Sequence, residues 1–264
     1  MIKEIFLQYL LQLLYTVGAV LIFGYLIARC NRWFYSNMGS MGMAACYVTG
    51  FIGTPVHELS HAFFCVIFGH KITDIQLFQI GSDDGTLGYV MHSYNPKNLY
   101  QRIGCFFIGL GPILVISCLL YLLALWLVPD MLLGVLGRVE MLGDDFEIKE
   151  LFGTVGYVFK VLWANIRTKE FWIYLLVAMF LALHMTLSGA DIKSVMGSFW
   201  ILALVWLGVD VVLGLFGILD KFTLLIMKGA SFLITFLALS LIISLAAVFL
   251  SAIIKFLRRK IRGW

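Results

Sequence analysis

Residues 54–61 read Thr-Pro-Val-His-Glu-Leu-Ser-His, an HExxH pattern that lies inside a long apolar segment. On a helix, positions i and i+4 share a face, so His57 and His61 can both reach one metal ion. Neutral imidazoles suit Zn²⁺, which accepts nitrogen ligands in a tetrahedral shell. Glu58 would lie beside that metal, where a carboxylate can take a proton from water. The pattern therefore predicts a helix that carries a zinc site and a catalytic base.

The composition indicates a polytopic membrane protein. Of the 264 residues, 62% are hydrophobic and only 13% are charged, whereas a soluble domain has about 25% charged residues. The net charge of +4 is too small to suggest a nucleic-acid partner. The five cysteines form no CxxC pair and are expected to be buried small hydrophobic residues. We expect one membrane-embedded domain over residues 1–264, surrounded by the lipid bilayer.

Six segments are long and apolar enough to be membrane spans, each of which needs about 20 mostly apolar residues. They are residues 5–28, 43–69, 103–128, 171–189, 197–219 and 230–256. The second segment contains the HExxH pattern. The pattern of segments predicts an all-α polytopic fold whose core is residues 43–195, with the first, fifth and sixth spans peripheral.

A different pattern separates the second and third spans. Residues 71–78 alternate apolar and polar side chains, residues 81–85 form a turn cluster, and residues 86–94 are again rich in β-formers. These features predict a β-hairpin. Because exposed sheet edges are not tolerated in hydrocarbon, we expect the hairpin at the membrane interface or covered by protein.

The loop at residues 130–170 is the most acidic part of the chain. Within it, residues 151–167 mix apolar and basic side chains and predict a helix that lies in the membrane surface.

The positive-inside rule suggests an orientation in the cell membrane. The chain ends in a basic tail at residues 255–262, which argues for a cytosolic C-terminus. Six spans then place the N-terminus and the hairpin in the cytosol too. Arg29 and Arg32 disagree with this orientation, because it places them outside.

The residues before the HExxH pattern predict a break in the span. Gly50, Gly53, Thr54 and Pro55 lie close together. Thr54 could cap a helix that restarts at Pro55, since threonine is a good N-cap and proline is tolerated at the first helical position. The alternative is a simple proline kink in a continuous helix.

A catalytic zinc site needs a third protein ligand. The candidates are Asp191, Asp210, His184, His70 and His92. Asp191 is favoured, because it follows small residues at the end of the fourth span, at a depth that matches His61. Asp210 is expected to lie deeper, His184 to support the site, and His70 and His92 to lie in the solvated loop region.

Three stretches resemble the site-2 protease family of intramembrane metalloproteases. HELSHAFFCVIFGHKITDIQLF (residues 57–78) is similar to that family's active-site helix and the strand after it. IGLGPIL (residues 108–114) and HMTLSGADIK (residues 184–193) stand where the family has an Ala-Gly-Pro stretch and a Leu-Asp-Gly motif. The chain departs from the family where Leu114 and Val115 replace an asparagine after Gly-Pro.

The resemblance implies one zinc ion per chain, held by His57, His61 and Asp191, with Glu58 as the base. It also implies that the hairpin engages an unwound substrate as an added strand. The hairpin residues expected to contact substrate are Ile75, Leu77, Tyr89 and Met91. Ser188 and His184 are the candidates for an oxyanion donor or for groups that support the ligands.

The expected function is a zinc endopeptidase that cuts membrane proteins with a single transmembrane helix. One alternative is another class of zinc peptidase, with Glu140, Glu147 or Glu150 as third ligand. A second is a non-proteolytic metal-binding protein, such as a transporter, a sensor or an inactive relative. Glu58 argues against an inactive relative, because a site that only binds has no need of a base.

Overall fold

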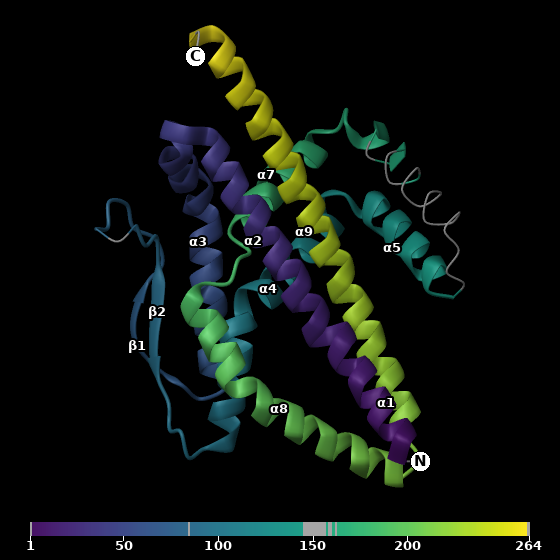
Figure 1. Ribbon diagram of the computed structural model, residues 1–264. Coiled ribbons are helices and arrows are strands. Elements are labelled where there is room, and N and C mark those ends of the chain that lie inside the picture. The colour runs from purple at the N-terminus through teal and green to yellow at the C-terminus, as the bar shows by residue number, and fades with distance from the viewer. Residues whose placement is uncertain (1, 84, 145–156, 158–159, 162, 263–264) are drawn as a thin grey trace.

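The computed structural model describes residues 2–83, 85–144, 157, 160–161 and 163–262, which are mostly helical and contain one two-stranded sheet (Figure 1). The first helices are α1 (Ile2–Leu13), a π-helical turn (Leu14–Gly18), α2 (Ala19–Met38), a 3₁₀ turn (Gly39–Met41) and α3 (Gly42–Ile67). The strands are β1 (Lys71–Gln76) and β2 (Tyr89–Ser93). The later helices are α4 (Leu99–Leu127), α5 (Pro129–Asp144), α7 (Lys169–Leu183), α8 (Gly189–Leu215) and α9 (Leu219–Arg262). The predicted helical class and hairpin are confirmed.

Four stretches of the described chain are long and apolar enough to cross a membrane: Ile2–Ile67, Leu99–Leu127, Gly189–Leu215 and Leu219–Ile261. The first stretch holds two helices of crossing length, because Gly39 adopts a φ of 58° and the chain folds back between α2 and α3 (Figure 1). α7 corresponds to the fourth predicted span, but has only 15 residues. It extends about 22 Å, which is less than the ~30 Å hydrocarbon core. The predicted span at 171–189 is therefore too long.

The α1–α2 segment and α9 run parallel to each other. Near the start of both, Gln8 donates to the Asp220 carboxylate at 2.7 Å. Near their ends, Asn37 donates to Ser251 at 3.2 Å. The N- and C-termini consequently lie at opposite ends of the molecule (Figure 1). Two parallel helices that both cross a bilayer have their ends on opposite sides, so the structure does not fit the expectation that both termini face the cytosol.

The hairpin lies alongside α3. β1 begins just after α3 ends, and the chain then runs back along the helix, where Phe78 contacts Phe51 and the Gly81 N–H donates to the Tyr47 hydroxyl at 3.3 Å. An extended chain rises about 3.3 Å per residue and a helix about 1.5 Å, so about ten residues of the hairpin run along about twenty residues of α3. α3 contacts one side of the hairpin, but most residues of β1 are exposed.

Helix α3 is continuous through the HExxH pattern. It begins at Gly42 and contains Pro55 in its interior. The alternative in which Thr54 caps a restarted helix is therefore wrong, and the HExxH residues lie well inside the helix. The reason is that α2, α4 and α7 all pack against α3, and such tertiary contacts override a local break signal.

Glycines on α4 allow three helices to meet at the site. A Cβ on Gly111 would lie 3.0 Å from the Ser60 carbonyl oxygen on α3. A Cβ on Gly109 would lie 2.8 Å from the Asp191 carbonyl oxygen on α8. Any larger residue at these positions would push α3 or α8 away. The Gly-Leu-Gly-Pro stretch thus holds the two ligand-bearing helices close to α4.

Part of the acidic loop lies outside the described residues. This applies to Glu147 and Glu150 and to most of the helix expected at 151–167. Glu140 belongs to α5, which lies on the side of the molecule away from the hairpin (Figure 1).

Candidate metal centre

Three side chains that the sequence marks as candidate ligands converge in the structure. His57 and His61 on α3 and Asp191 on α8 each offer one ligand atom, and these atoms lie within 4.8 Å of one another. The Nε2 atoms of the two histidines are 3.2 Å apart. Nε2 of His61 is 3.4 Å from Oδ1 of Asp191. The structure therefore brings together the two HExxH histidines and the favoured third ligand.

Each histidine is oriented by a hydrogen bond from its other ring nitrogen. Nδ1 of His57 lies 2.9 Å from the His184 carbonyl oxygen. Nδ1 of His61 lies 2.7 Å from the Ile108 carbonyl oxygen. A carbonyl oxygen only accepts hydrogen bonds, so both Nδ1 atoms carry the proton and both Nε2 atoms keep a lone pair. This is the tautomer in which a neutral histidine binds a metal through Nε2.

Asp191 is held by the start of its own helix. The Ser188 backbone N–H donates to Oδ2 of Asp191 at 2.7 Å, and the Asp191 N–H donates to the Ser188 hydroxyl at 3.1 Å. This reciprocal pair is a capping box at the N-terminus of α8. It leaves Oδ1 facing the histidines. Ser188, a candidate for either role, thus supports the aspartate ligand.

Two of the three separations between the ligand atoms match those expected around a tetrahedral metal ion such as zinc. Zn–N bonds of about 2.0–2.1 Å in a tetrahedral shell place neighbouring ligand atoms about 3.3 Å apart. The separations of 3.2 and 3.4 Å agree with this value. Without a cation between them, three atoms that each direct a lone pair to one point repel one another. Two imidazoles and one carboxylate are also a typical ligand set for catalytic zinc.

Glu58 lies between α3 and the hairpin. Glu58 is buried, with only 6% of its surface exposed. A Cβ on Gly88 would lie 2.9 Å from Cγ of Glu58, so only glycine lets the hairpin approach this carboxylate. Because Glu58 follows His57 directly, its carboxylate is held where the hairpin meets the metal centre.

The His184 side chain supports α3 and is not a ligand. A Cβ on Gly53 would lie 2.5 Å from Cδ2 of His184, so the ring occupies a notch that glycine leaves open. Its Nε2 atom lies 3.1 Å from the Thr49 hydroxyl. The His184 carbonyl oxygen is the atom that holds His57. In the sequence, Gly53 signals only a helix break, and nothing there marks Thr49 or Ile108 as part of the site.

The other candidate ligands lie elsewhere. Asp210 is fully buried on α8. It comes 19 residues after Asp191, which corresponds to about 28 Å along a helix.

His70 and His92 face each other, with their Nδ1 atoms 3.0 Å apart. Nε2 of His70 donates to the Gln101 carbonyl oxygen at 2.8 Å. This histidine pair ties the hairpin to the start of α4, so the expectation that both are solvated loop residues is wrong for His70, which is buried.

The four hairpin residues expected to contact substrate do not form one surface. Asp74 pairs with Met91 and Gln76 with Tyr89, so Met91 and Tyr89 lie on one face. Ile75 pairs with Val90 on the other face, to which Leu77 also belongs by alternation. The irregular register between Ile72 and Asp74 accounts for the difference, because one extra residue in a strand reverses the facing of the residues after it.

A cavity of about 730 Å³ is lined by His184, whose carbonyl oxygen holds His57, and by Ile192, which follows Asp191 in the chain. Its walls come from α2, from the hairpin loop and from the α7–α8 connection. The polar groups around it include Asn31, Arg32, Tyr35, His184 and Thr186.

The site therefore combines three oriented ligand atoms, a carboxylate next to them and a partly polar cavity.

Comparison of the chain with family models, with curated proteins and with solved structures found no match.

Proposed function

We propose that this protein is a zinc-dependent endopeptidase that hydrolyses peptide bonds in or near the transmembrane segments of other membrane proteins. The main support is the cluster of His57, His61 and Asp191, with Glu58 adjacent, on helices that are apolar enough to cross a bilayer. We further propose that the chain is a divergent relative of the site-2 protease family. This proposal rests on the three similar stretches and on the position of Asp191 beside the two histidines.

The bound Zn²⁺ would act as a Lewis acid that lowers the pKa of water toward neutrality and polarises the scissile carbonyl. Glu58 takes the proton from the attacking water as the new C–O bond forms. It passes the same proton to the amine nitrogen as the C–N bond breaks. The backbone carbonyls of His184 and Ile108 keep both imidazoles in the required tautomer throughout.

The hairpin and the cavity are the proposed substrate-binding region. A transmembrane helix hides its carbonyl groups in hydrogen bonds and must unwind before hydrolysis. An unwound segment can pair with a free strand edge of the hairpin, which supplies the backbone partners that the segment has lost. Gly88, which directly precedes β2, lies against Glu58. A substrate strand added to the hairpin beside Gly88 would pass close to this base.

We also propose an orientation in the membrane that differs from the one expected from the sequence. Arg29 and Arg32 on α2 lie toward the same end of the molecule as Lys255 and Arg258 on α9, because α2 and α9 run parallel. Placing this basic end in the cytosol satisfies the positive-inside rule for all of these residues. The N-terminus and the base of the hairpin then lie on the opposite side.

The decisive experiment replaces the proposed base. Glu58→Gln keeps the size of the side chain but removes its ability to accept a proton, so we expect cleavage to fall by about 10²–10⁴-fold. The rate is measured on a purified single-span substrate that is reconstituted with the enzyme in liposomes. Metal analysis should find zinc still bound, because the substitution leaves all three ligands in place.

Asp210→Asn is the matched control, since it neutralises another buried carboxylate of the membrane region and should leave cleavage unchanged. Retained activity in Glu58→Gln would rule out the mechanism. Zinc binding by the wild type without cleavage of any transmembrane substrate would favour a non-proteolytic metal protein.

A further inference from the structure

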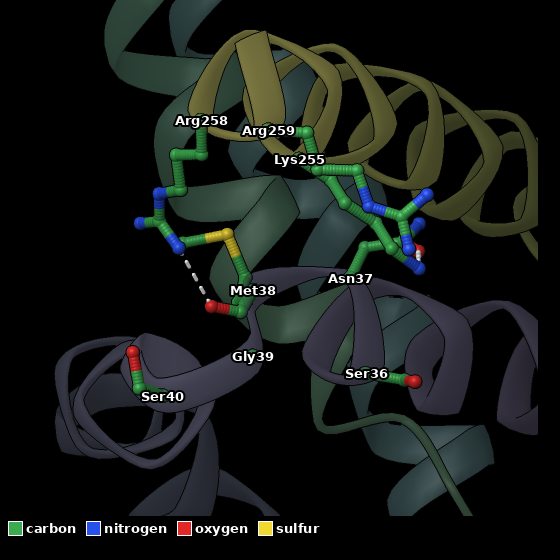
Figure 2. Close-up of a pocket in the computed structure, with 8 residues that line it drawn as sticks. All are labelled: Ser36, Asn37, Met38, Gly39, Ser40, Lys255, Arg258 and Arg259. Atoms are coloured by element: carbon green, nitrogen blue, oxygen red, sulfur yellow. Dashed lines mark hydrogen bonds between the residues drawn. The ribbon is translucent and has the colours of Figure 1, made fainter. Parts of the chain in front are cut away.

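A second pocket lies at the end of the molecule where α2 turns into α3 and α9 ends (Figure 2). Its volume is about 900 Å³. It is lined by Ser36, Asn37, Met38, Gly39, Ser40, Lys255, Arg258 and Arg259. None of these residues belongs to the metal centre, and they have no role in the proposed proteolytic function.

The charge of this pocket is not neutralised. Lys255 donates to the Asn37 side-chain oxygen at 3.1 Å, and Arg258 donates to the Met38 carbonyl oxygen at 2.8 Å (Figure 2). Both acceptors are neutral. Within the part of the chain that the structure describes, no ion pair involves these two residues or Arg259. Three basic side chains therefore line one pocket that has no carboxylate among its lining residues, with Lys255 and Arg259 on one side and Arg258 on the other (Figure 2).

The backbone contributes potentials of both signs, because α2 and α9 end at the pocket while α3 begins after it. The side chains therefore determine which ligand the pocket favours. Ser36 and Ser40 contribute hydroxyl groups that can donate to an anionic oxygen.

Large apolar side chains are exposed near the end of α9 and at the start of α3. Phe256 is 66% exposed, and Phe249, seven residues earlier on α9, is 70% exposed. Met43 is 55% exposed. Exposed apolar side chains on the elements that form the pocket offer a surface to the acyl chains of a lipid. A soluble phosphate would gain nothing from this apolar surface.

We propose that the pocket binds the phosphate headgroup of an anionic phospholipid from the surrounding bilayer. The three cations and the hydroxyl groups hold the headgroup, as basic pockets between transmembrane helices do. The acyl chains extend along the exposed apolar residues of α9. A lipid at this position bridges the α2–α3 turn and the end of α9.

Native mass spectrometry of the full chain in detergent tests this proposal. The protein is titrated with phosphatidylglycerol and, in parallel, with phosphatidylcholine. We expect the wild type to bind phosphatidylglycerol about tenfold more tightly or better. Each lysine or arginine is worth about a fivefold change in affinity, so Lys255→Gln with Arg259→Gln should weaken binding by about 30-fold. Arg258 is kept, because it also holds the Met38 carbonyl.

The matched control is Lys228→Gln with Lys260→Gln, which removes the same charge from exposed positions on the same helix. It should bind phosphatidylglycerol like the wild type, and thermal unfolding verifies that both double variants are folded. Equal loss in the two double variants would overturn the proposal, because binding would then depend only on net charge. If inorganic phosphate at the same concentration as the lipid displaced phosphatidylglycerol, the lipid proposal would also be overturned.

Discussion

The geometry of the metal centre depends on atoms that no motif names. The carbonyl oxygens of His184 and Ile108 fix the two imidazoles, and the Ser188 N–H fixes Asp191. Such supporting contacts set the tautomer and the direction of each ligand. Asp191 uses one oxygen to cap its helix and turns the other toward His61, so the fold alone sets its position.

Removal of Asp191 should empty the site. Asp191→Ala removes one of three ligands and also breaks the capping box, so we expect zinc to fall from about one per chain to a small fraction. Zinc is measured by elemental analysis after dialysis of the purified protein. Asp210→Asn should keep the wild-type content. The reverse result would assign the third ligand to Asp210.

The hairpin is the element most dependent on its surroundings. It pairs only two strands, which are marginal on their own in water, and it is held by α3 and by the His70–His92 contact. Burial, then the nearby His70 and then His61, lower the pKa of His92 below its ordinary value. The folded state therefore favours neutral His92, because burial and the neighbouring imidazoles disfavour its charged form.

Acid should loosen the hairpin. Folding lowers the pKa of His92. Neutral His92 therefore stabilises the hairpin fully above its pKa in the unfolded chain, about 6.5. This stabilisation is lost as the pH falls through the pKa of His92 in the folded chain. We expect faster amide hydrogen exchange at residues 89–93 at pH 5 than at pH 7, after correction for intrinsic exchange. His92→Leu should abolish this pH dependence, and an unchanged dependence in that variant would exclude the histidine pair as its cause.

The parallel course of α1–α2 and α9 is the basis of the proposed orientation of the whole molecule. The 44 residues of α9 extend about 66 Å, roughly twice the hydrocarbon thickness, so its basic end projects beyond the core of the bilayer. All the basic residues of α2 and of the tail then lie at one end. In the orientation proposed above, Arg29 and Arg32 lie on the same side as the basic tail, so they no longer disagree with the positive-inside rule.

Cysteine labelling tests this arrangement. Lys97 lies between β2 and α4, at the base of the hairpin, and Lys260 lies near the end of α9. In a background without the five native cysteines, Lys97→Cys and Lys260→Cys should react with an impermeant maleimide from opposite sides of the membrane. The positive-inside rule assigns Lys260 to the cytosol. Labelling of both positions from the same side would contradict the parallel arrangement.

The local features of this protein follow from its sequence. The i, i+4 spacing places His57 and His61 on one face, because a helix has 3.6 residues per turn. The long apolar segments predict the crossing helices, and the turn cluster at 81–85 predicts the hairpin. Asp191 is favoured over Asp210 because small residues and matching depth place it near His61. Each of these inferences depends on neighbours in the chain or on the thickness of a bilayer.

The features that the sequence does not reveal depend on contacts between distant residues. The shortness of α7, the continuity of α3 through Pro55 and the parallel course of α1–α2 and α9 all reflect packing between helices. The division of the hairpin residues between two faces depends on a register shift that alternation cannot reveal. The ligand-supporting carbonyls of His184 and Ile108 are backbone groups, which every residue has, so only the folded chain can select them.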